Sequence, residues 1–465
     1  VFDMPEVEKI VKPGEVYENG WDFDNDAYYN IKVVKAEILD SVNGINEKDM
    51  YSAERLNDVT NSDGTLKGYN REEIIYGDGV NTIDTIKDVK FIKSGSPMPD
   101  ALKFNDGNPV KTQEDWLKRR EEIKEILQRE CYGHRPPDPQ EKPTVRMIQP
   151  PTSFGNSDIE ATNSTGTLRI FSSRPWADSE WCFDFMVFTP DNLAPEEKLP
   201  VMICGDGNWA KSIRREIVKI ATLNRMAFVI FNRCDFVIDP PFPQTNVLRD
   251  SYLERRYPEY DFASIMGWAY GFSRVIDALE FVPEIDTSKI AVTGHSRGGK
   301  ASLLAGAFDE RITITCSNGS GSGGAGSWHF IAEGGEPYES IGKDLGKWFN
   351  NTFPKYYNNL KELPYDAHYI KALCLPRAQV STDGFADLWA NPAGACVTTE
   401  ATRNIAKALG YDPYSVAMHF REGKHEHSVI DWMAQFEFCR HIFFGDPCGW
   451  VNYDYPYNGI EECCK

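Results

Sequence analysis

The run Gly294-His-Ser-Arg-Gly298 has the spacing of a serine nucleophile held on a sharp turn. Residues Lys289–Thr293 before it are rich in β-branched side chains and predict a strand, while the small residues Ala301–Ala307 predict a helix after it. A nucleophile between a strand and a helix has a strained backbone, and a glycine two residues to either side relieves the crowding. The amino end of the helix then faces an oxyanion as it forms. The pattern predicts acyl transfer with Ser296 as the nucleophile.

The serine needs a base, and in this arrangement the chain order is serine, then acid, then histidine. His425 lies in the polar loop Arg421–His427. This loop follows a strand-like run at Ser415–Phe420 and precedes an apolar helix predicted at Ile430–Phe438. Because a loop after the last strand can reach the serine, we predict His425 as the base. His427 in the same loop is the open alternative.

The acid must hold the second nitrogen of the imidazole and stabilise its positive charge. A strand predicted at Ala372–Ser381 is followed by Asp383 and Asp387, both at the carboxyl end of that strand. Asp383 precedes Gly384 and has the pattern of an ordinary turn. We therefore favour Asp387 as the acid, with Asp383 as the alternative.

The composition of the chain changes near residues 93–99. Residues 1–95 show short alternating runs and Asp, Asn and Gly turns, which predict a small β-rich region of unknown role. Residues 96–465 alternate apolar strands with helices, which predicts a parallel sheet covered by helices, the three-layer α/β-hydrolase sandwich. The further strands are expected at Phe183–Thr189, Leu199–Cys204, Met226–Asn232 and Ile312–Cys316, and the further helices at Thr112–Leu127, Ile265–Val282 and Lys300–Phe308.

The formal charge of −20 argues against nucleic acid and against anionic membranes as partners. No apolar run is long enough to span a bilayer. The eleven cysteines show no Cys-x-x-Cys pair, and an oxyanion hole supplies the electrophile, so we expect neither a metal nor a cofactor. We expect a secreted or cell-surface location, although the first residues carry no leader; a cytoplasmic location is the alternative.

From Met98 to about Phe444 the sequence resembles the glucuronoyl esterases, carbohydrate esterase family 15. The turn that carries the nucleophile, called the nucleophile elbow, reads Gly-x-Ser-Arg-x-Gly-Lys in that family. In this chain it is Gly294-His-Ser-Arg-Gly-Gly-Lys300. The added Arg and Lys make this match far more specific than the generic elbow. Further similar segments are Pro99–Gly107, Ser320–Ala325, Lys347–Asn350, Leu363–His368, Leu375–Arg377 and Asp387–Pro392.

The resemblance implies an esterase acting on 4-O-methyl-glucuronic acid side chains of xylan, including their ester links to lignin alcohols. It implies that Arg297 helps to hold the oxyanion, that Lys300 contacts a sugar hydroxyl and that Trp389 packs against the uronate ring. The residue chemistry agrees for Arg297, since a guanidinium beside the nucleophile offers rigid donors to a developing negative charge.

The chain departs from the fungal pattern at two places. Fungal members carry the catalytic Glu just before the Ser-Gly-Ser-Gly-Gly run, where this chain has Asn318-Gly319, while bacterial members often place the acid after the next strand, as at Asp387. The fungal sugar-contacting Gln and Glu lack a clear counterpart, for which Glu333 and Glu336 are candidates. An acetyl or feruloyl xylan esterase and a non-catalytic polysaccharide-binding protein are the alternative functions.

Overall fold

The computed structural model describes residues 91–93, 97–155, 164–207, 215–239, 251–421, 423–449, 451 and 457–463. The predicted β-rich region at residues 1–95 lies almost wholly outside the described residues and stays a prediction. From that region only β1 (Phe91–Lys93) is described, and it pairs antiparallel with β9 (Phe330–Ala332). The residues just before the predicted boundary therefore pack on the domain that follows it.

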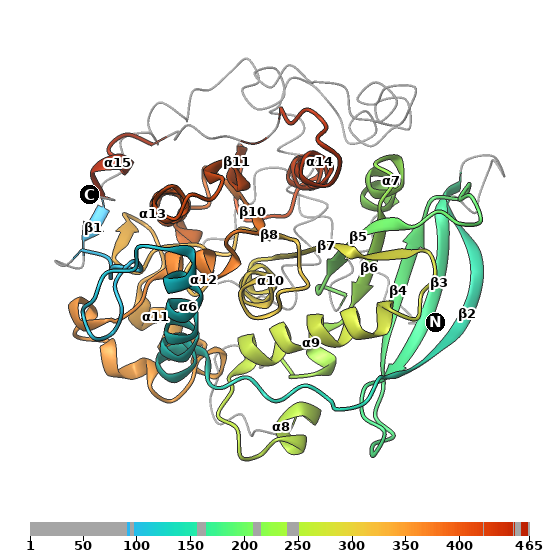
Figure 1. The fold of residues 1–465 in the computed structure, drawn as a ribbon, viewed down its shortest axis with the longest axis horizontal. Coiled ribbons are helices and arrows are strands. Elements are labelled where there is room, and N and C mark those ends of the chain that lie inside the picture. Colours follow the sequence, from blue (N-terminus) through green and yellow to red (C-terminus); the bar gives the residue numbers. More distant parts are fainter. Residues whose placement is uncertain are drawn as a thin grey trace, which may run out of the picture.

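A mixed sheet of nine strands forms the centre of the described chain, in the order β11-β10-β8-β7-β5-β6-β4-β3-β2 (Figure 1). The strands from β11 to β6 run parallel, and β4, β3 and β2 continue the sheet antiparallel. The strand bounds are β2 (Thr144–Gly155), β3 (Ser164–Arg174), β4 (Phe183–Thr189), β5 (Leu199–Cys204), β6 (Ala227–Phe231), β7 (Ile285–His295), β8 (Ile314–Asn318), β10 (Ala378–Gly384) and β11 (Val416–Arg421).

Helices cover both faces of the sheet, and each face has its own apolar core. In Figure 1, α7 and α14 lie above the sheet, and α9 and α10 lie below it. None of the described helices has the length and apolar character needed to cross a membrane. The helix bounds are α6 (Gln113–Leu127), α7 (Arg215–Leu223), α8 (Tyr252–Arg256), α9 (Ser264–Leu279), α10 (Arg297–Phe308), α11 (Tyr338–Asp344), α12 (Ala367–Cys374), α13 (Pro392–Ala408), α14 (Val429–Phe444) and α15 (Ile460–Cys463).

The structure confirms most of the predicted elements and corrects two expectations. The sheet is mixed and not wholly parallel, because β4, β3 and β2 run antiparallel. The predicted strands β4 and β5 have the observed bounds, and Thr112 caps α6 through a capping box. The strand predicted at Ala372–Ser381 is wrong in its first half, because Ala372–Cys374 ends helix α12 and β10 begins only at Ala378. Every side chain of α12 is buried, and a helix buried on all sides has the same continuous apolar run as a buried strand.

The four strands β7, β8, β10 and β11 are neighbours and parallel, so their carboxyl ends meet at one edge of the sheet. The register aligns His295 with Asn318 and Asn318 with Thr382 across these strands. The loops that begin at this edge carry the residues predicted for catalysis. Ligand sites of parallel sheets lie at such carboxyl ends.

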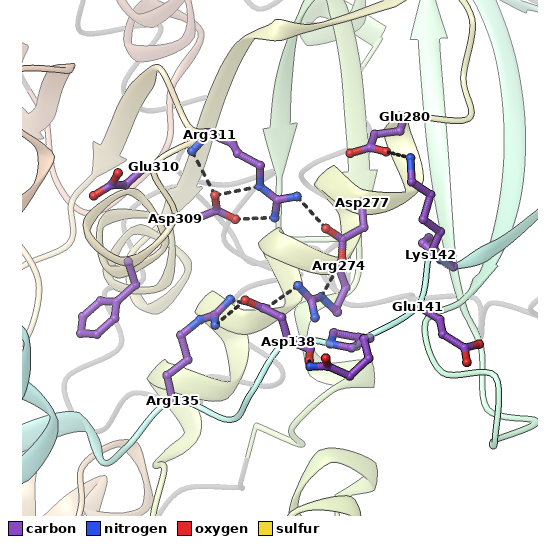
Figure 2. A pocket seen from close by; sticks show the side chains of 14 residues that line it. Arg135, Asp138, Glu141, Lys142, Arg274, Asp277, Glu280, Asp309, Glu310 and Arg311 are labelled. Carbon is purple, nitrogen blue, oxygen red and sulfur yellow. Dashed lines mark hydrogen bonds and ion pairs between the residues drawn. The ribbon is translucent and has the colours of Figure 1, made fainter.

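A charged pocket lies at the opposite end of α10, where Asp309 follows the helix. Three arginines and three aspartates alternate in it, so that each carboxylate lies between guanidinium groups or against one of them (Figure 2). The alternating residues are Arg135, Asp138, Arg274, Asp277, Arg311 and Asp309. Because α10 has twelve residues, this network lies about 18 Å from Ser296. We interpret it as a stabilising ion-pair network.

Replacing Asp309 with asparagine is expected to lower the free energy of unfolding by about 1–2 kcal/mol at pH 7. Burial alone would raise the pKa of Asp309, but hydrogen bonds and charge from Arg311 lower it from 3.8 to about 2. A carboxylate with a lowered pKa stabilises the fold above its unfolded value, and this contribution is lost as the pH falls toward about 2. Urea denaturation of both proteins at pH 7, 5 and 3.5 measures the difference. A difference that stays constant or grows toward acid pH would contradict this account.

Candidate active site

Ser296 stands at the junction of β7 and α10 with φ 53° and ψ −118°, a left-handed backbone that is strained for a residue with a side chain. A Cβ atom at Gly294 would lie 2.4 Å from the carbonyl oxygen of Gly298. A Cβ atom at Gly298 would lie 2.0 Å from Oδ1 of Asp206. Only glycine fits at these two positions, as the sequence pattern predicted.

The segment after β5 and the end of β8 both hold the turn. The backbone N–H of His295 donates to Oδ2 of Asp206 at 2.7 Å, and the backbone N–H of Ser296 donates to the carbonyl oxygen of Asn318 at 2.9 Å. The side chain of Asn318 also bonds to Nδ1 of His295 at 2.6 Å. Asn318 lies in the segment where the fungal members of the family carry the catalytic Glu. It holds the turn here and makes no bond to His425.

His425 lies beside this turn, in the loop after β11. Its ring centroid is 4.5 Å from that of His295, and a Cβ atom at Gly319 would lie 3.4 Å from its Nδ1. His425 Nδ1 bonds to Oδ2 of Asp387 at 2.6 Å. This bond orients Nε2 as the ring nitrogen available for proton transfer.

His427, the alternative base, occupies a different environment. Its ring stacks on Trp432 with the centroids 3.9 Å apart, and its centroid is 6.1 Å from that of His295. His425 bonds to Asp387, whereas the ring of His427 packs on Trp432. The geometry therefore favours His425 over His427.

The two candidate acids, Asp387 and Asp383, also differ in whether they bond to His425. Asp387 precedes a 3₁₀ turn at Leu388–Ala390 without capping it, and its carboxylate points to His425 instead. Asp383 is buried within β10, and neither of its oxygens has a hydrogen-bond partner among the described residues. Burial raises the pKa of Asp383, and the nearby charge of Asp387 raises it further. A carboxyl held toward its neutral form and unbonded to histidine is poorly suited to the acid's role.

Arg297 and Lys300 lie one turn apart on α10, and both cations lie over the ring of Trp348. The guanidinium carbon of Arg297 is 4.9 Å from the ring centroid and the ammonium of Lys300 is 5.8 Å from it. Lys300 is buried and donates to the carbonyl oxygen of Ser320 at 2.5 Å. Burial lowers the pKa of Lys300, while Glu336 opposes that shift.

Glu336 and Trp389 complete the group. Glu336 is buried, and its backbone N–H donates to the carbonyl oxygen of Trp389 at 2.9 Å. Burial raises the pKa of Glu336, and the charges of Lys300 and His425 oppose that shift. Trp389 is 51% exposed, so its ring is open to a ligand. Glu333, the other candidate, is exposed.

Comparisons with known proteins point to one family. A family model described as glucuronyl esterase of fungi matches residues 182–410. A 4-O-methyl-glucuronoyl methylesterase of Wolfiporia cocos is 31% identical over 341 residues, which cover 71% of this chain and 76% of that protein. The chain belongs to the glucuronoyl esterases. It thus shares a family with enzymes named for the ester of a uronic acid.

Solved glucuronoyl esterases share the fold. The carbohydrate esterase family 15 enzyme of Caldicellulosiruptor kristjansonii superposes with a TM-score of 0.63 at 26% identity, over 82% of this chain and 99% of that one. The Sporotrichum thermophile enzyme was solved as a mutant in complex with methyl 4-O-methyl-β-D-glucopyranuronate. It superposes with a TM-score of 0.61 at 22% identity, over 81% of this chain and 95% of that one. These structures confirm the α/β-hydrolase fold.

The sequence alone did not reveal the residues that hold this glucuronoyl esterase site together. Asp206, Arg233 and Asp239 follow β5 and β6, and no local pattern links them to the elbow. Gly205-Asp206-Gly207 directly after a buried strand was the available signal for one of them. Glu336 was one of two open candidates, and its burial separates it from Glu333.

Proposed function

We propose that the chain is a serine esterase that hydrolyses esters of glucuronic acid and its 4-O-methyl derivative. The hydrogen bond of 2.6 Å between Asp387 and His425, beside the strained Ser296, carries this proposal. A member of the glucuronoyl esterases with a complete set of nucleophile, base and acid is equipped for acyl transfer. Ser296, His425, Asp387 and Arg297 are the proposed catalytic residues.

In the first step Nε2 of His425 accepts the proton of the Ser296 hydroxyl as the oxygen attacks the carbonyl carbon of the uronate ester. The carbonyl oxygen becomes an oxyanion, which the Arg297 guanidinium and the amino end of α10 stabilise. The bond to the alcohol then breaks, and His425 gives its proton to the leaving alkoxide. The products are the free alcohol and a glucuronoyl ester of Ser296.

In the second step a water molecule attacks the carbonyl carbon of that ester. His425 accepts a proton from the water and returns one to the Ser296 oxygen as the acyl bond breaks. Glucuronic acid leaves and loses its proton to the solvent at neutral pH, and the enzyme returns to its starting state. Asp387 stabilises the imidazolium in both steps and keeps the proton of the resting ring on Nδ1.

Lys300, Glu336 and Trp389 are proposed to bind the sugar. The exposed ring of Trp389 offers an apolar face, while Lys300 and Glu336 supply a donor and an acceptor for hydroxyl groups. The ester form of the substrate is neutral at its reacting carboxyl, so the charge of −20 on the chain does not repel it. We propose glucuronoxylan and its ester links to lignin as the natural substrates, met outside the cell or at its surface.

Rates on three esters test the substrate class. We expect the benzyl ester of glucuronic acid to be hydrolysed with a higher kcat/KM than acetylated xylan or a feruloyl ester, because only in the uronate ester does the acyl group itself carry the sugar hydroxyls that Lys300 and Glu336 are proposed to bind. Rapid deacetylation without hydrolysis of the glucuronate ester would favour the acetyl esterase. A wild type that neither hydrolyses any ester nor reacts with a fluorophosphonate would favour the non-catalytic, polysaccharide-binding alternative.

A further inference from the structure

A row of four charged side chains runs beneath the elbow, and the mechanism above uses only the last of them. The row alternates acid and base: Asp206, Arg233, Asp239 and Arg297. Arg233 is fully buried and forms an ion pair with Asp206, and its other terminal nitrogen lies 3.7 Å from Oδ2 of Asp239. Oδ2 of Asp239 also accepts a hydrogen bond from Nη1 of Arg297 at 2.8 Å.

The carboxylates of Asp206 and Asp239 hydrogen-bond to the residues on either side of Ser296. Asp206 binds the backbone N–H of His295, the residue before Ser296, at 2.7 Å. Asp239 binds the side chain of Arg297, the residue after it. Both carboxylates approach the guanidinium of Arg233. The positions of these two hydrogen bonds therefore depend on each other.

The row is also anchored from its sides. The guanidinium carbon of Arg233 lies 5.0 Å from the ring centroid of Trp268, and that of Arg297 lies 4.9 Å from the ring centroid of Trp348. The side chain of Asp239 is 13% exposed and that of Arg297 is 11% exposed, so their ion pair is shielded from solvent. Shielded, charge-assisted hydrogen bonds are strong and hold a defined geometry.

We infer that Asp239 is a positioning residue of the esterase, which aims the Arg297 guanidinium at the oxyanion. A guanidinium is planar, so one bond at Nη1 and one ring beneath it fix the directions of all its donors. Without Asp239 the guanidinium loses the charged partner at Nη1, so its donors point at the oxyanion in a smaller fraction of encounters. This inference rests on the proposed function, in which Arg297 stabilises the oxyanion.

Two variants of Asp239 separate positioning from folding. Asp239→Ala removes the hydrogen bond and ion pair to Arg297, whereas Asp239→Asn keeps the shape and one acceptor but removes the charge. We expect kcat for the benzyl ester of glucuronic acid to fall about 10- to 100-fold in Asp239→Ala and less in Asp239→Asn, with KM changed by less than about threefold. If Asp239→Ala does not fold, the isosteric Asp239→Asn decides the question by the same comparison.

Repeating both variants in an Arg297→Ala background supplies the decisive comparison. If Asp239 acts through Arg297, its replacement should change kcat by less than about twofold there. Asp309→Asn is the matched control, because it breaks an aspartate–arginine pair of similar length, 2.7 Å, at the other end of the same helix. It should leave kcat unchanged.

An equal loss of kcat in both backgrounds, or a loss confined to KM, would overturn the inference. The rate at which a fluorophosphonate labels Ser296 provides a readout that needs no sugar, and we expect it to fall in parallel with kcat. If the wild type is labelled rapidly but does not hydrolyse glucuronate esters, the proposed function fails, and the labelling rates still decide the role of Asp239.

Discussion

Replacing Ser296 with alanine is expected to lower kcat for the benzyl ester of glucuronic acid by about 10⁶-fold, the largest effect of any single substitution considered for this chain. Alanine removes the attacking oxygen, so the acyl-enzyme cannot form and only the binding groups and the oxyanion donors remain. KM is expected to change little, because Ser296 contributes to the reaction more than to sugar binding. Steady-state rates on purified protein measure both quantities.

The matched control for Ser296→Ala is Ser302→Ala on the same helix. The hydroxyl of Ser302 is buried and donates to the carbonyl oxygen of Gly299, away from the reacting groups. Its replacement should leave kcat within about twofold of the wild type. If Ser296→Ala kept more than a hundredth of the wild-type rate, another residue would be the nucleophile.

The second-largest effect is expected for Asp387→Asn, which should lower kcat by about 10⁴-fold. The asparagine side chain can still reach Nδ1 of His425, but it carries no charge to stabilise the imidazolium and can hold the ring in the wrong tautomer. The rates of Asp387→Asn and wild type over the accessible pH range, with the same ester, measure this loss.

Asp383→Asn is the matched control four residues away in the chain. Its carboxyl is as buried as that of Asp387 but makes no hydrogen bond to His425. We expect Asp383→Asn to keep kcat within a few times the wild-type value. The protein should be at least as stable as the wild type, because the substitution removes a carboxyl whose charged form is disfavoured by burial. A large loss in Asp383→Asn together with an active Asp387→Asn would assign the acid to Asp383.

The sequence predicted the buried strands better than the exposed ones. Leu199–Cys204 and Phe183–Thr189 are predicted with their observed bounds, because each is a short apolar run between turn residues, although Phe183–Thr189 lies in the antiparallel part of the sheet. Strand β2 was not predicted, since it forms an edge of the sheet, is largely exposed and contains Pro150 and Pro151. Its place depends on pairing with β3, which no pattern within the strand reveals.

The same distinction holds for the site. The neighbouring glycines identify Ser296 from the sequence. The chain order of acid and base leaves two candidates for the acid and two for the base. The choice of Asp387 over Asp383 and of His425 over His427 depends on which side chains face each other across two loops, and the structure supplies that geometry. The row from Asp206 to Arg297 could not be predicted at all, because its members meet only after three separate strands are in register.

The most direct test is to locate the residue that a fluorophosphonate labels and to ask whether a glucuronate ester protects it. Peptide mass spectrometry of the labelled protein gives the residue, and the labelling rate at increasing concentrations of methyl glucuronate gives the protection. We predict a single label on Ser296, slowed by methyl glucuronate and unaffected by matched concentrations of methyl ferulate. A label on another residue, or labelling of Ser296 that methyl glucuronate does not slow, would contradict the assignment of this chain as a serine esterase for glucuronate esters.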